Sequence, residues 1–232
     1  MLDVHVVKAR QHFIVDAAFR IAPGESCGLF GVSGAGKSTI LSCIAGIESP
    51  DGGHVRFAET VLFPPPLPLH LRPIGYLTQE ANLFPHLSVA RNVRFGLPQS
   101  GVAEAEPWIA ELRERLHIEP IWEVPAREIS GGQARRVALA RMLARKPPLV
   151  LLDEPFSGLD RHLIRELIDA LREWHSRLGF TLLVVDHEPE VLERLCPTTI
   201  AVENGRIVQH ASWTTLRAAP ATPLLARLLE PL

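Results

Sequence analysis

Eight residues near the N-terminus constrain the fold more than any other stretch of this sequence. Residues 31–38 read GVSGAGKS; they follow the short apolar run SCGLF and precede a segment in which Ile40, Leu41, Ile44 and Ile47 are spaced as on one face of a helix. The pattern G-x-x-x-x-G-K-[ST] between a strand and a helix is typical of a loop that wraps a polyphosphate in backbone N–H groups. The sequence therefore predicts an α/β fold built around a phosphate-binding loop.

The residues of this loop have distinct expected roles. The helix that starts near Lys37 adds the positive end of its dipole to the site. Lys37 is expected to reach the β- and γ-phosphates, and the Ser38 hydroxyl to ligate Mg²⁺. The predicted nucleotide contacts are Gly31, Val32, Ser33, Gly34, Ala35, Gly36, Lys37, Ser38 and Thr39. The alternative, a glycine-rich turn that binds nothing, is disfavoured because the loop lies between a strand and a helix.

Two carboxylates end the next clearly apolar strand. The run LVLLDEP at 149–155 places Asp153 and Glu154 at the carboxyl end of that strand. A helical segment at 161–179 leads to a second apolar strand, which predicts a parallel sheet covered on both faces. An exposed pair ending a strand would be the better interpretation of these carboxylates in isolation. With a phosphate loop upstream, we expect Asp153 to hold Mg²⁺ and Glu154 to orient or deprotonate the attacking water.

The rest of the chain divides by pattern into further parts. Alternating apolar and polar residues in LDVHVV and FIVDAAFRI predict two antiparallel strands, and Asn204-Gly205 predicts a hairpin. No buried strand is evident from about Ala81 to Lys146, so this stretch is interpreted as an inserted helical subdomain. We expect one domain in which residues 1–80 and 147–212 form the core with its β subdomain, 81–146 the helical subdomain and 213–232 a C-terminal tail.

A second pair of glycines precedes another strong helix. Residues 129–133 read ISGGQ, and Ser130 is a natural N-cap for the helix that follows. A cap needs only one such residue, whereas adjacent Gly131 and Gly132 carry an entropic cost that close approach to a ligand would justify. A helix end rich in N–H groups suits a γ-phosphate. A simple cap with glycines for chain entry remains the alternative.

Taken with the phosphate loop, ISGGQ resembles the LSGGQ signature of the ATP-binding-cassette (ABC) ATPases, with Ile129 in place of leucine. The resemblance implies a P-loop NTPase (RecA-like) core with an N-terminal antiparallel β subdomain and an inserted helical subdomain. It also implies ATP and Mg²⁺ as cofactors. In the family, two subunits associate head to tail, and the signature of one contacts the ATP held by the other. Ser130, Gly131, Gly132 and Gln133 would make that contact in a homodimer of this chain.

Three more segments match the family in order. Gln79 in YLTQEANLFPH resembles the family glutamine that links the metal and the attacking water to the membrane partner. Asp160 in SGLD would lie at the dimer contact, and His187 in VVDHEPE would contact the γ-phosphate and the attacking water. The resemblance thus implies Glu154, His187 and Gln79 as catalytic residues, and Ser38, Gln79 and Asp153 as metal ligands.

Two positions depart from the family pattern. Asp186 precedes His187 where the family commonly has serine or threonine, and a neighbouring carboxylate favours a protonated imidazole. The family often stacks adenine on an aromatic residue of the first strand region, a place that falls near Lys8 to Arg10 in this chain. No aromatic residue lies there; Phe13 or His12 is the expected substitute, and a loosely held base is the alternative.

Composition limits the partners. The chain is 47% apolar and 22% charged with a formal net charge of −2, which is typical of a folded domain and argues against nucleic acid as a partner. Its longest apolar runs, LVLL and TLLVV, are too short to span a bilayer, and the N-terminus lacks a secretory signal pattern. Any role at a membrane is therefore expected to come through a partner. Three cysteines without metal-ligand spacing indicate free thiols in a reduced compartment.

The stretches FGVSGAGKSTILSCIAGI and IGYLTQEANLFPHLSVARNVRFGL are similar to ATPase subunits of bacterial importers, most of all to the molybdate group and then to the iron(III), sulfate and polyamine groups. The resemblance implies ATP-driven uptake of a small solute such as molybdate at the cytoplasmic face of a membrane. Transmembrane permease subunits and a periplasmic or extracellular solute-binding protein would be the partners. Two alternatives are a non-transport ABC ATPase and another P-loop ATPase or kinase; neither is favoured, because coiled coils, zinc sites and a second cassette are missing, and a kinase gives no reason for ISGGQ.

Overall fold

The computed structural model describes residues 1–11, 13–97 and 101–230. Its strands are β1 (Leu2–Ala9), β2 (Ile14–Ile21), β3 (Ser26–Phe30), β4 (Gly52–Phe57), β5 (Thr60–Phe63), β6 (Ile74–Leu77), β7 (Leu149–Asp153), β8 (Thr181–Val185), β9 (Thr198–Glu203) and β10 (Arg206–Ser212). Its α-helices are α1 (Lys37–Ala45), α2 (Val89–Arg94), α3 (Val102–Arg115), α4 (Gly131–Leu143), α5 (Arg161–Leu178), α6 (Pro189–Leu195), α7 (Trp213–Ala218) and α8 (Pro223–Leu228), with short 3₁₀ turns at Leu69–Leu71, Glu119–Ile121 and Ala126–Glu128.

The strands form one sheet with the order β5-β4-β1-β2-β10-β9-β3-β8-β7-β6. Strand β3 pairs in parallel with β9 and β8, and β7 pairs in parallel with β8 and β6. The antiparallel pair β1–β2 and the hairpin β9–β10 confirm the sequence predictions at both ends of the chain. Strands β5 and β6 were not predicted; each has only four residues, and β6 pairs with a strand some seventy residues later.

Both faces of the parallel strands are buried, as the sequence predicts. Alternate residues of β7 contribute to two different apolar clusters: Val150 and Leu152 pack with helices α3 to α6, and Leu149 and Leu151 pack with α1 and the N-terminal strands. Because side chains alternate across a strand, one continuous apolar run supplies both faces. The carboxyl end of β7 is therefore held from both sides.

Helix α1 is shorter than its apolar spacing predicts. It ends at Ala45 because Gly46 adopts a left-handed conformation with φ 85° and caps the last carbonyls. Ile47, expected on the buried face, lies beyond this cap and is 59% exposed. The first three positions of the predicted stripe, Ile40, Leu41 and Ile44, are fully buried as expected.

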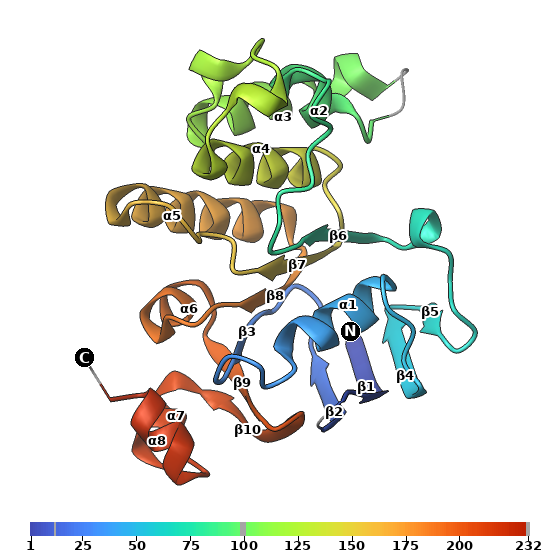
Figure 1. The fold of residues 1–232 in the computed structure, drawn as a ribbon, viewed down its shortest axis with the longest axis vertical. Helices are drawn as coiled ribbons and strands as arrows, with labels where there is room; N and C mark the ends of the chain where they lie inside the picture. Colours follow the sequence, from blue (N-terminus) through green and yellow to red (C-terminus); the bar gives the residue numbers. More distant parts are fainter. Residues whose placement is uncertain (12, 98–100, 231–232) are drawn as a thin grey trace.

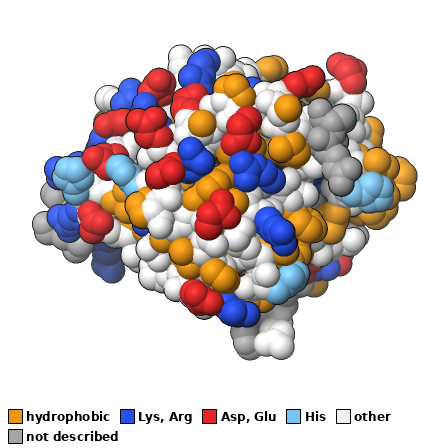
Figure 2. Space-filling model, turned by 90° about the horizontal axis from the view of Figure 1, so that it is seen from above, with side chains coloured by type: hydrophobic (Ala, Val, Ile, Leu, Met, Phe, Trp, Pro, Cys, Tyr) orange, Lys and Arg blue, Asp and Glu red, His pale blue; other side chains and the backbone are white. Residues whose placement is uncertain are grey.

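Helices α2, α3 and α4 lie together at the end of the molecule farthest from β1, β2 and β4 (Figure 1). Buried Asn92 of α2 joins them to the preceding chain: its side chain accepts from the amide of Phe84 and donates to the carbonyls of Phe84, Leu87 and Ser88. These helices occupy the range of the predicted insertion, whose limits stay a prediction. On the face seen in Figure 2, acidic, basic and apolar side chains are interspersed, so neither sign of charge dominates.

Two further properties bear on how the chain meets its surroundings. No helix among the described residues is long and apolar enough to cross a bilayer. Cys27, Cys43 and Cys196 are free and buried. Burial raises the pKa of Cys27 to about 12 and that of Cys43 to about 11, and raises the pKa of Cys196 as well, so all three are thiols rather than thiolates at neutral pH.

Candidate active site

The predicted phosphate loop connects β3 to α1 and depends on glycine at both of its ends. Gly31 passes so close to the next strand that an added Cβ would lie 2.2 Å from the carbonyl oxygen of Val202. Gly36 has φ 101°, a conformation that side chains disfavour, and it directly precedes the first turn of α1. Backbone geometry thus fixes the loop, and the curve of the loop leaves the N-terminal end of α1 accessible.

Lys37 lies across this loop. Its side chain is only 7% exposed, and Nζ donates to the carbonyl oxygens of Gly31 at 2.8 Å and Val32 at 2.9 Å. Burial lowers the pKa of Lys37, while the charges of nearby Glu154 and Asp153 raise it. The ammonium group is therefore held over the loop beside two carboxylates, where a polyphosphate would meet it.

The first turn of α1 leaves amides available. Its N-cap, Gly36, has no side chain to cap them, and the first intrahelical bond runs from the amide of Ile40 to the carbonyl of Gly36 at 3.0 Å. The amides of residues 37–39 consequently have no acceptor within the helix. Free amides and the helix dipole together favour an anion at this end.

A cavity of about 710 Å³ opens beside the loop, a size suited to a small-molecule ligand. Arg10 enters it from the end of β1, donates to the Thr39 hydroxyl at 2.8 Å and pairs with Glu48 at 2.6 Å. The lining residues are Ala9, Arg10, Gln11, Phe13, Ser33, Gly34, Gly36, Lys37, Ser38, Thr39, Gln79 and Glu154. Of the two aromatic candidates for the base, Phe13 lines the cavity and His12 lies outside the described residues.

The predicted acidic pair stands at the end of β7. Asp153 is 2% exposed; its Oδ2 lies 3.5 Å from the Tyr76 hydroxyl, and its Oδ1 has no hydrogen-bond partner among the described residues. Burial raises the pKa of Asp153, and a hydrogen bond from Ser38 opposes that rise. A buried, unpartnered carboxylate oxygen next to a hydroxyl fits a hard cation such as Mg²⁺, which prefers oxygen ligands.

Glu154 is brought to the cavity together with Gln79. The Gln79 side chain donates from Nε2 to Oε2 of Glu154 at 3.2 Å, although the two residues are far apart in the sequence. Glu154 has φ 48°, an uncommon conformation outside glycine, and its amide donates to the carbonyl of Val185. The structure thus places a carboxylate and an amide side by side at the phosphate loop.

Asp186 and His187 follow the neighbouring strand, β8. Asp186 is buried and accepts from the amide of Glu188 at 3.0 Å, and burial raises its pKa. The His187 ring is exposed, with Nδ1 3.7 Å from Asp186 Oδ1, and does not line the cavity. Its predicted contact with a γ-phosphate, and the effect of Asp186 on its protonation, stay predictions.

The second predicted anion site lies apart from this cavity. Ser130 caps α4: its Oγ accepts from the amide of Gln133, and Oε1 of Gln133 accepts from the amide of Ser130 at 2.8 Å. This capping box leaves the amides of Gly131 and Gly132 without an acceptor in the helix. Residues 130–133 are not among those that line the described cavity. Asp160 is also elsewhere, as the exposed N-cap of α5.

Comparison with known proteins identifies the family. The sequence model described as "ABC transporter" matches residues 14–157. This chain belongs to the ABC transporter family. It is 38% identical over 219 residues to the molybdenum import ATP-binding protein ModC of Rhodopseudomonas palustris (strain HaA2), covering 91% of this chain and 57% of that protein. It is also 38% identical to the thiamine import ATP-binding protein ThiQ of Jannaschia sp. (strain CCS1), covering 97% of this chain and 98% of ThiQ.

Solved structures agree on the fold. A dimeric ATP-binding cassette in a post-hydrolysis state with ADP and Pi superposes with a TM-score of 0.80 at 26% identity, covering 91% of this chain and 98% of that one. A nucleotide-free cassette from an ABC transporter superposes with a TM-score of 0.81 at 20% identity over the whole chain. The predicted ABC ATPase fold is confirmed. The chain spans just over half the length of ModC.

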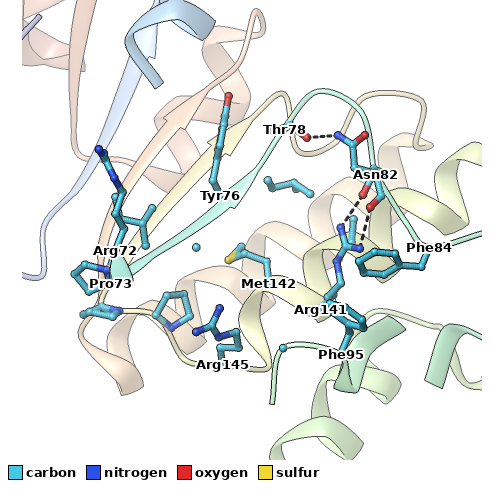
Figure 3. A pocket seen from close by; sticks show the side chains of 18 residues that line it. Arg72, Pro73, Tyr76, Thr78, Asn82, Phe84, Phe95, Arg141, Met142 and Arg145 are labelled. Carbon is cyan, nitrogen blue, oxygen red and sulfur yellow. Dashed lines mark hydrogen bonds between the residues drawn. The ribbon is translucent and has the colours of Figure 1, made fainter. Parts of the chain in front are cut away.

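The cassette carries a second cavity, of about 450 Å³, between β6 and α4 (Figure 3). Arg141 crosses it, donating to the carbonyls of Ala81 and Asn82 and lying 5.6 Å from the ring centre of Phe84. Phe84 in turn stacks on Phe95 with centroids 4.1 Å apart, and Phe95 is 59% exposed. The cavity adjoins Thr78, so it begins next to the segment that carries Gln79.

Sequence reasoning missed two residues that shape the candidate active site. Tyr76, the only tyrosine of the chain, approaches Asp153 from β6, a strand that was not predicted. Arg10 falls where an aromatic residue was expected, and its position in the cavity depends on the pairing of β1 with its neighbours. No local signal marks either residue, since β6 has only four residues and the position of Arg10 depends on long-range strand pairing.

Proposed function

We propose that this chain is the ATP-binding and ATP-hydrolysing subunit of an importer, which energises uptake of a small solute through membrane-spanning partner subunits. The observation that carries the proposal is the meeting of Lys37, the free amides of α1 and the Gln79–Glu154 pair at one cavity. These parts supply phosphate binding and a carboxylate for water activation in the same place. Membership of the ABC transporter family and the similarity of the chain to import ATP-binding proteins support the ATPase reaction and its role in uptake.

In the proposed reaction, the loop amides and Lys37 bind the phosphates, and Glu154 accepts the proton of the attacking water. Gln79 orients Glu154 through its amide. A bound Mg²⁺ would neutralise charge that develops on the phosphate oxygens, and Ser38, Asp153 and Gln79 are the residues proposed to hold it. Phe13 is proposed to contact the base. Since these groups do not by themselves enclose a nucleotide, an exposed surface of the ATP is left for a second subunit.

The second subunit is proposed to close the site head to tail. The amides of Gly131 and Gly132 have no acceptor in the helix, Ser130 and Gln133 cap each other, and none of the four lines the cavity of this chain. Asp160 is exposed and does not line the cavity either. Residues 130–133 and Asp160 therefore need an ATP held by another chain in order to act on it. A homodimer with two composite sites satisfies all of them, and the dimeric cassette with ADP and Pi supports this arrangement.

Glu154→Gln tests the reaction. The amide keeps the size of the side chain but cannot accept a proton, so ATP turnover should fall by at least about 100-fold while ATP binding is retained. Light scattering should then show a stable dimer with ATP and a monomer with ADP. Unchanged turnover would mean that Glu154 is not the base, and failure of the wild-type chain to hydrolyse ATP with its membrane subunits would overturn the proposal itself.

The membrane partner is proposed to dock in the cavity between β6 and α4. Exposed Phe95 and Arg145 offer an apolar contact and a positive charge, which suit an apolar segment carrying an acidic residue. The position next to the Gln79 segment would let docking influence hydrolysis. A permease subunit at a membrane places this chain on the cytoplasmic face.

The combined substitution Phe95→Ala with Arg145→Glu tests this docking. Stimulation of ATP turnover by the membrane-spanning partner subunits should be lost, because contact area and charge complementarity both disappear. Nucleotide affinity without those subunits should be unchanged. Arg56→Glu, which changes an exposed arginine on β4, is the matched control and should keep full stimulation. Equal loss in the control would contradict the docking site.

The cargo is proposed from the relatives alone. Several relatives are named for molybdenum import, and others for thiamine or sulfate/thiosulfate import, so an oxyanion such as molybdate is the first candidate. A solute-binding protein outside the membrane would complete the importer. The cargo does not enter the cavities of this chain in such an arrangement, and uptake of radiolabelled molybdate against thiamine by the assembled complex distinguishes the candidates.

A further inference from the structure

One buried arginine contacts the backbone behind both catalytic side chains. Arg135 lies in the second turn of α4 and is only 4% exposed. Its Nη1 donates to the carbonyl oxygens of Thr78 and of Gln79, the latter at 2.8 Å. Its Nη2 donates to those of Asp153 and of Glu154, the latter at 2.5 Å, and Nε donates to that of Pro155 at 3.3 Å. A single guanidinium thus joins five carbonyls from two separate segments.

The two segments are the ones that end β6 and β7. Side chains of Gln79 and Glu154 leave these segments toward the cavity and meet at 3.2 Å, while their carbonyls point the other way onto Arg135. Because a peptide plane is rigid, fixing its carbonyl restricts the direction in which the neighbouring side chain departs. The separation between the Gln79 amide and the Glu154 carboxylate is therefore fixed by the contacts of Arg135 with their backbones as well as by their own hydrogen bond.

Helix packing alone does not require an arginine at position 135. It forms no ion pair with a carboxylate in the described part of the chain, and burial lowers its pKa while the charges of Asp153 and Glu154 raise it. Burying a guanidinium is costly, and an apolar side chain would pack α4 at lower free energy. Only a planar group with five donors in a fixed fork can hold five carbonyls at once.

We propose that Arg135 is a positioning residue for ATP hydrolysis, which holds the backbone beneath Gln79 and Glu154 so that the two side chains stay aligned at the phosphate loop. The inference rests on the hydrolytic function proposed above for this cavity. In this proposal, Arg135 contacts neither the nucleotide nor the attacking water and acts only through Gln79 and Glu154.

Arg135→Met is the test, with Arg136→Met as its matched control. Methionine keeps the length and apolar stem but removes every donor. Arg136 is the next residue of the same helix and also donates to backbone carbonyls, those of Leu116 at 2.7 Å and His117 at 2.6 Å. It has no hydrogen bond to the Gln79 or Glu154 segments. Arg135→Met loses five hydrogen bonds and Arg136→Met loses two, so the loss of stability should be larger in Arg135→Met, but only that variant should disturb hydrolysis.

The expected result is a split between kcat and KM. Misalignment of the catalytic pair should lower kcat of Arg135→Met by about 100-fold with KM for ATP and ATP-dependent dimer formation within about threefold of wild type. Arg136→Met should keep kcat within about threefold. Arg135→Lys retains charge and three donors and should recover part of the lost kcat. Equal kcat for Arg135→Met and wild type, or equal loss in both methionine variants, overturns the proposal.

A second measurement does not depend on turnover. Amide hydrogen exchange of residues 78–80, 153 and 154 should be faster in Arg135→Met than in Arg136→Met, because only Arg135→Met removes the donors to the carbonyls of these two segments. Equal exchange at these residues in the two variants would also overturn the assignment. If exchange changes as expected but the wild-type chain with its membrane subunits hydrolyses no ATP, the proposed function fails and the structural role of Arg135 stands.

Discussion

Helices α1 and α4 both have glycines at their N-terminal ends, but their first turns are built in opposite ways. Helix α1 begins after left-handed Gly36, has no side-chain cap, and opens into a cavity that is lined by its own chain. Helix α4 begins after Ser130, is closed by a reciprocal capping box, and faces away from that cavity. The N-terminal end of α1 can bind a ligand in the cavity of its own chain. The N-terminal end of α4 forms hydrogen bonds within its capping box and leaves the amides of Gly131 and Gly132 without an acceptor in the helix.

The glycines show the same difference. At Gly36, an added Cβ would lie 2.9 Å from the Val15 side chain, and the residue that carries it would have to adopt a left-handed backbone conformation. The fold therefore requires glycine at this position. An added Cβ at Gly131 would meet nothing within 4 Å, and its backbone is ordinary helix. Nothing in this chain explains Gly131. Close approach by a molecule from outside would explain it, and this favours a second subunit as the partner of α4.

The sharpest test of this comparison disables each helix end in a different chain. Lys37→Met removes the phosphate contact at α1, and Ser130→Arg puts a bulky charge at α4. Each homodimer should lose ATP turnover by about 100-fold or more, since both of its sites lack one stabilising contact. Mixing the two variants should restore about a quarter of wild-type activity, because half of the dimers are mixed and each of those has one intact site. Turnover is measured by phosphate release.

Binding measurements separate the two ends further. Ser130→Arg should leave the ATP affinity of the monomer unchanged, and Lys37→Met should lower it, as read by titration with a fluorescent ATP analogue. Absence of recovery on mixing, or loss of monomer affinity in Ser130→Arg, would show that both helix ends act on the same ATP within one chain.

A smaller effect is expected when alanine replaces one glycine at each end. Gly36→Ala should destabilise the fold by about 1–3 kcal/mol because of its left-handed backbone. Gly131→Ala should stabilise it by about 0.4–1 kcal/mol, since alanine restricts the unfolded chain and fits the helix. Urea unfolding measures both. Turnover of the Gly131→Ala dimer should nevertheless fall, and a variant that is both more stable and fully active would remove the argument for close approach at α4.

Much of this molecule follows from local sequence. The loop at 31–38, the hairpin at Asn204-Gly205 and the cap at Ser130 each depend on residue types that favour one backbone conformation, and each is found where expected. The two apolar strands that lead to Asp153 and Asp186 are recognisable because burial on both faces leaves the runs 149–152 and 182–185 without polar residues. The family resemblance then relates these separate signals to one another.

What sequence reasoning missed depends on partners far along the chain. Strand β6 has four residues and exists because it pairs with β7, so its own pattern is too short to predict it. Tyr76 and Arg135 acquire their contacts only when β6, β7 and α4 come together. Ile47 was misplaced because helical spacing carries no information on where a left-handed glycine stops the helix. Long-range pairing and caps thus override local periodicity.

The buried thiols of this chain have a practical consequence for trapping the dimer. Cys27, Cys43 and Cys196 are enclosed, and the pKa of each is raised, so mild oxidants and maleimides should leave them unmodified in the folded protein. Cysteine cross-linking can therefore be carried out without first replacing the native cysteines. A Ser33→Cys and Gly131→Cys pair would introduce the only reactive thiols among the described residues, and a covalent bond between two chains would record their contact without any nucleotide assay.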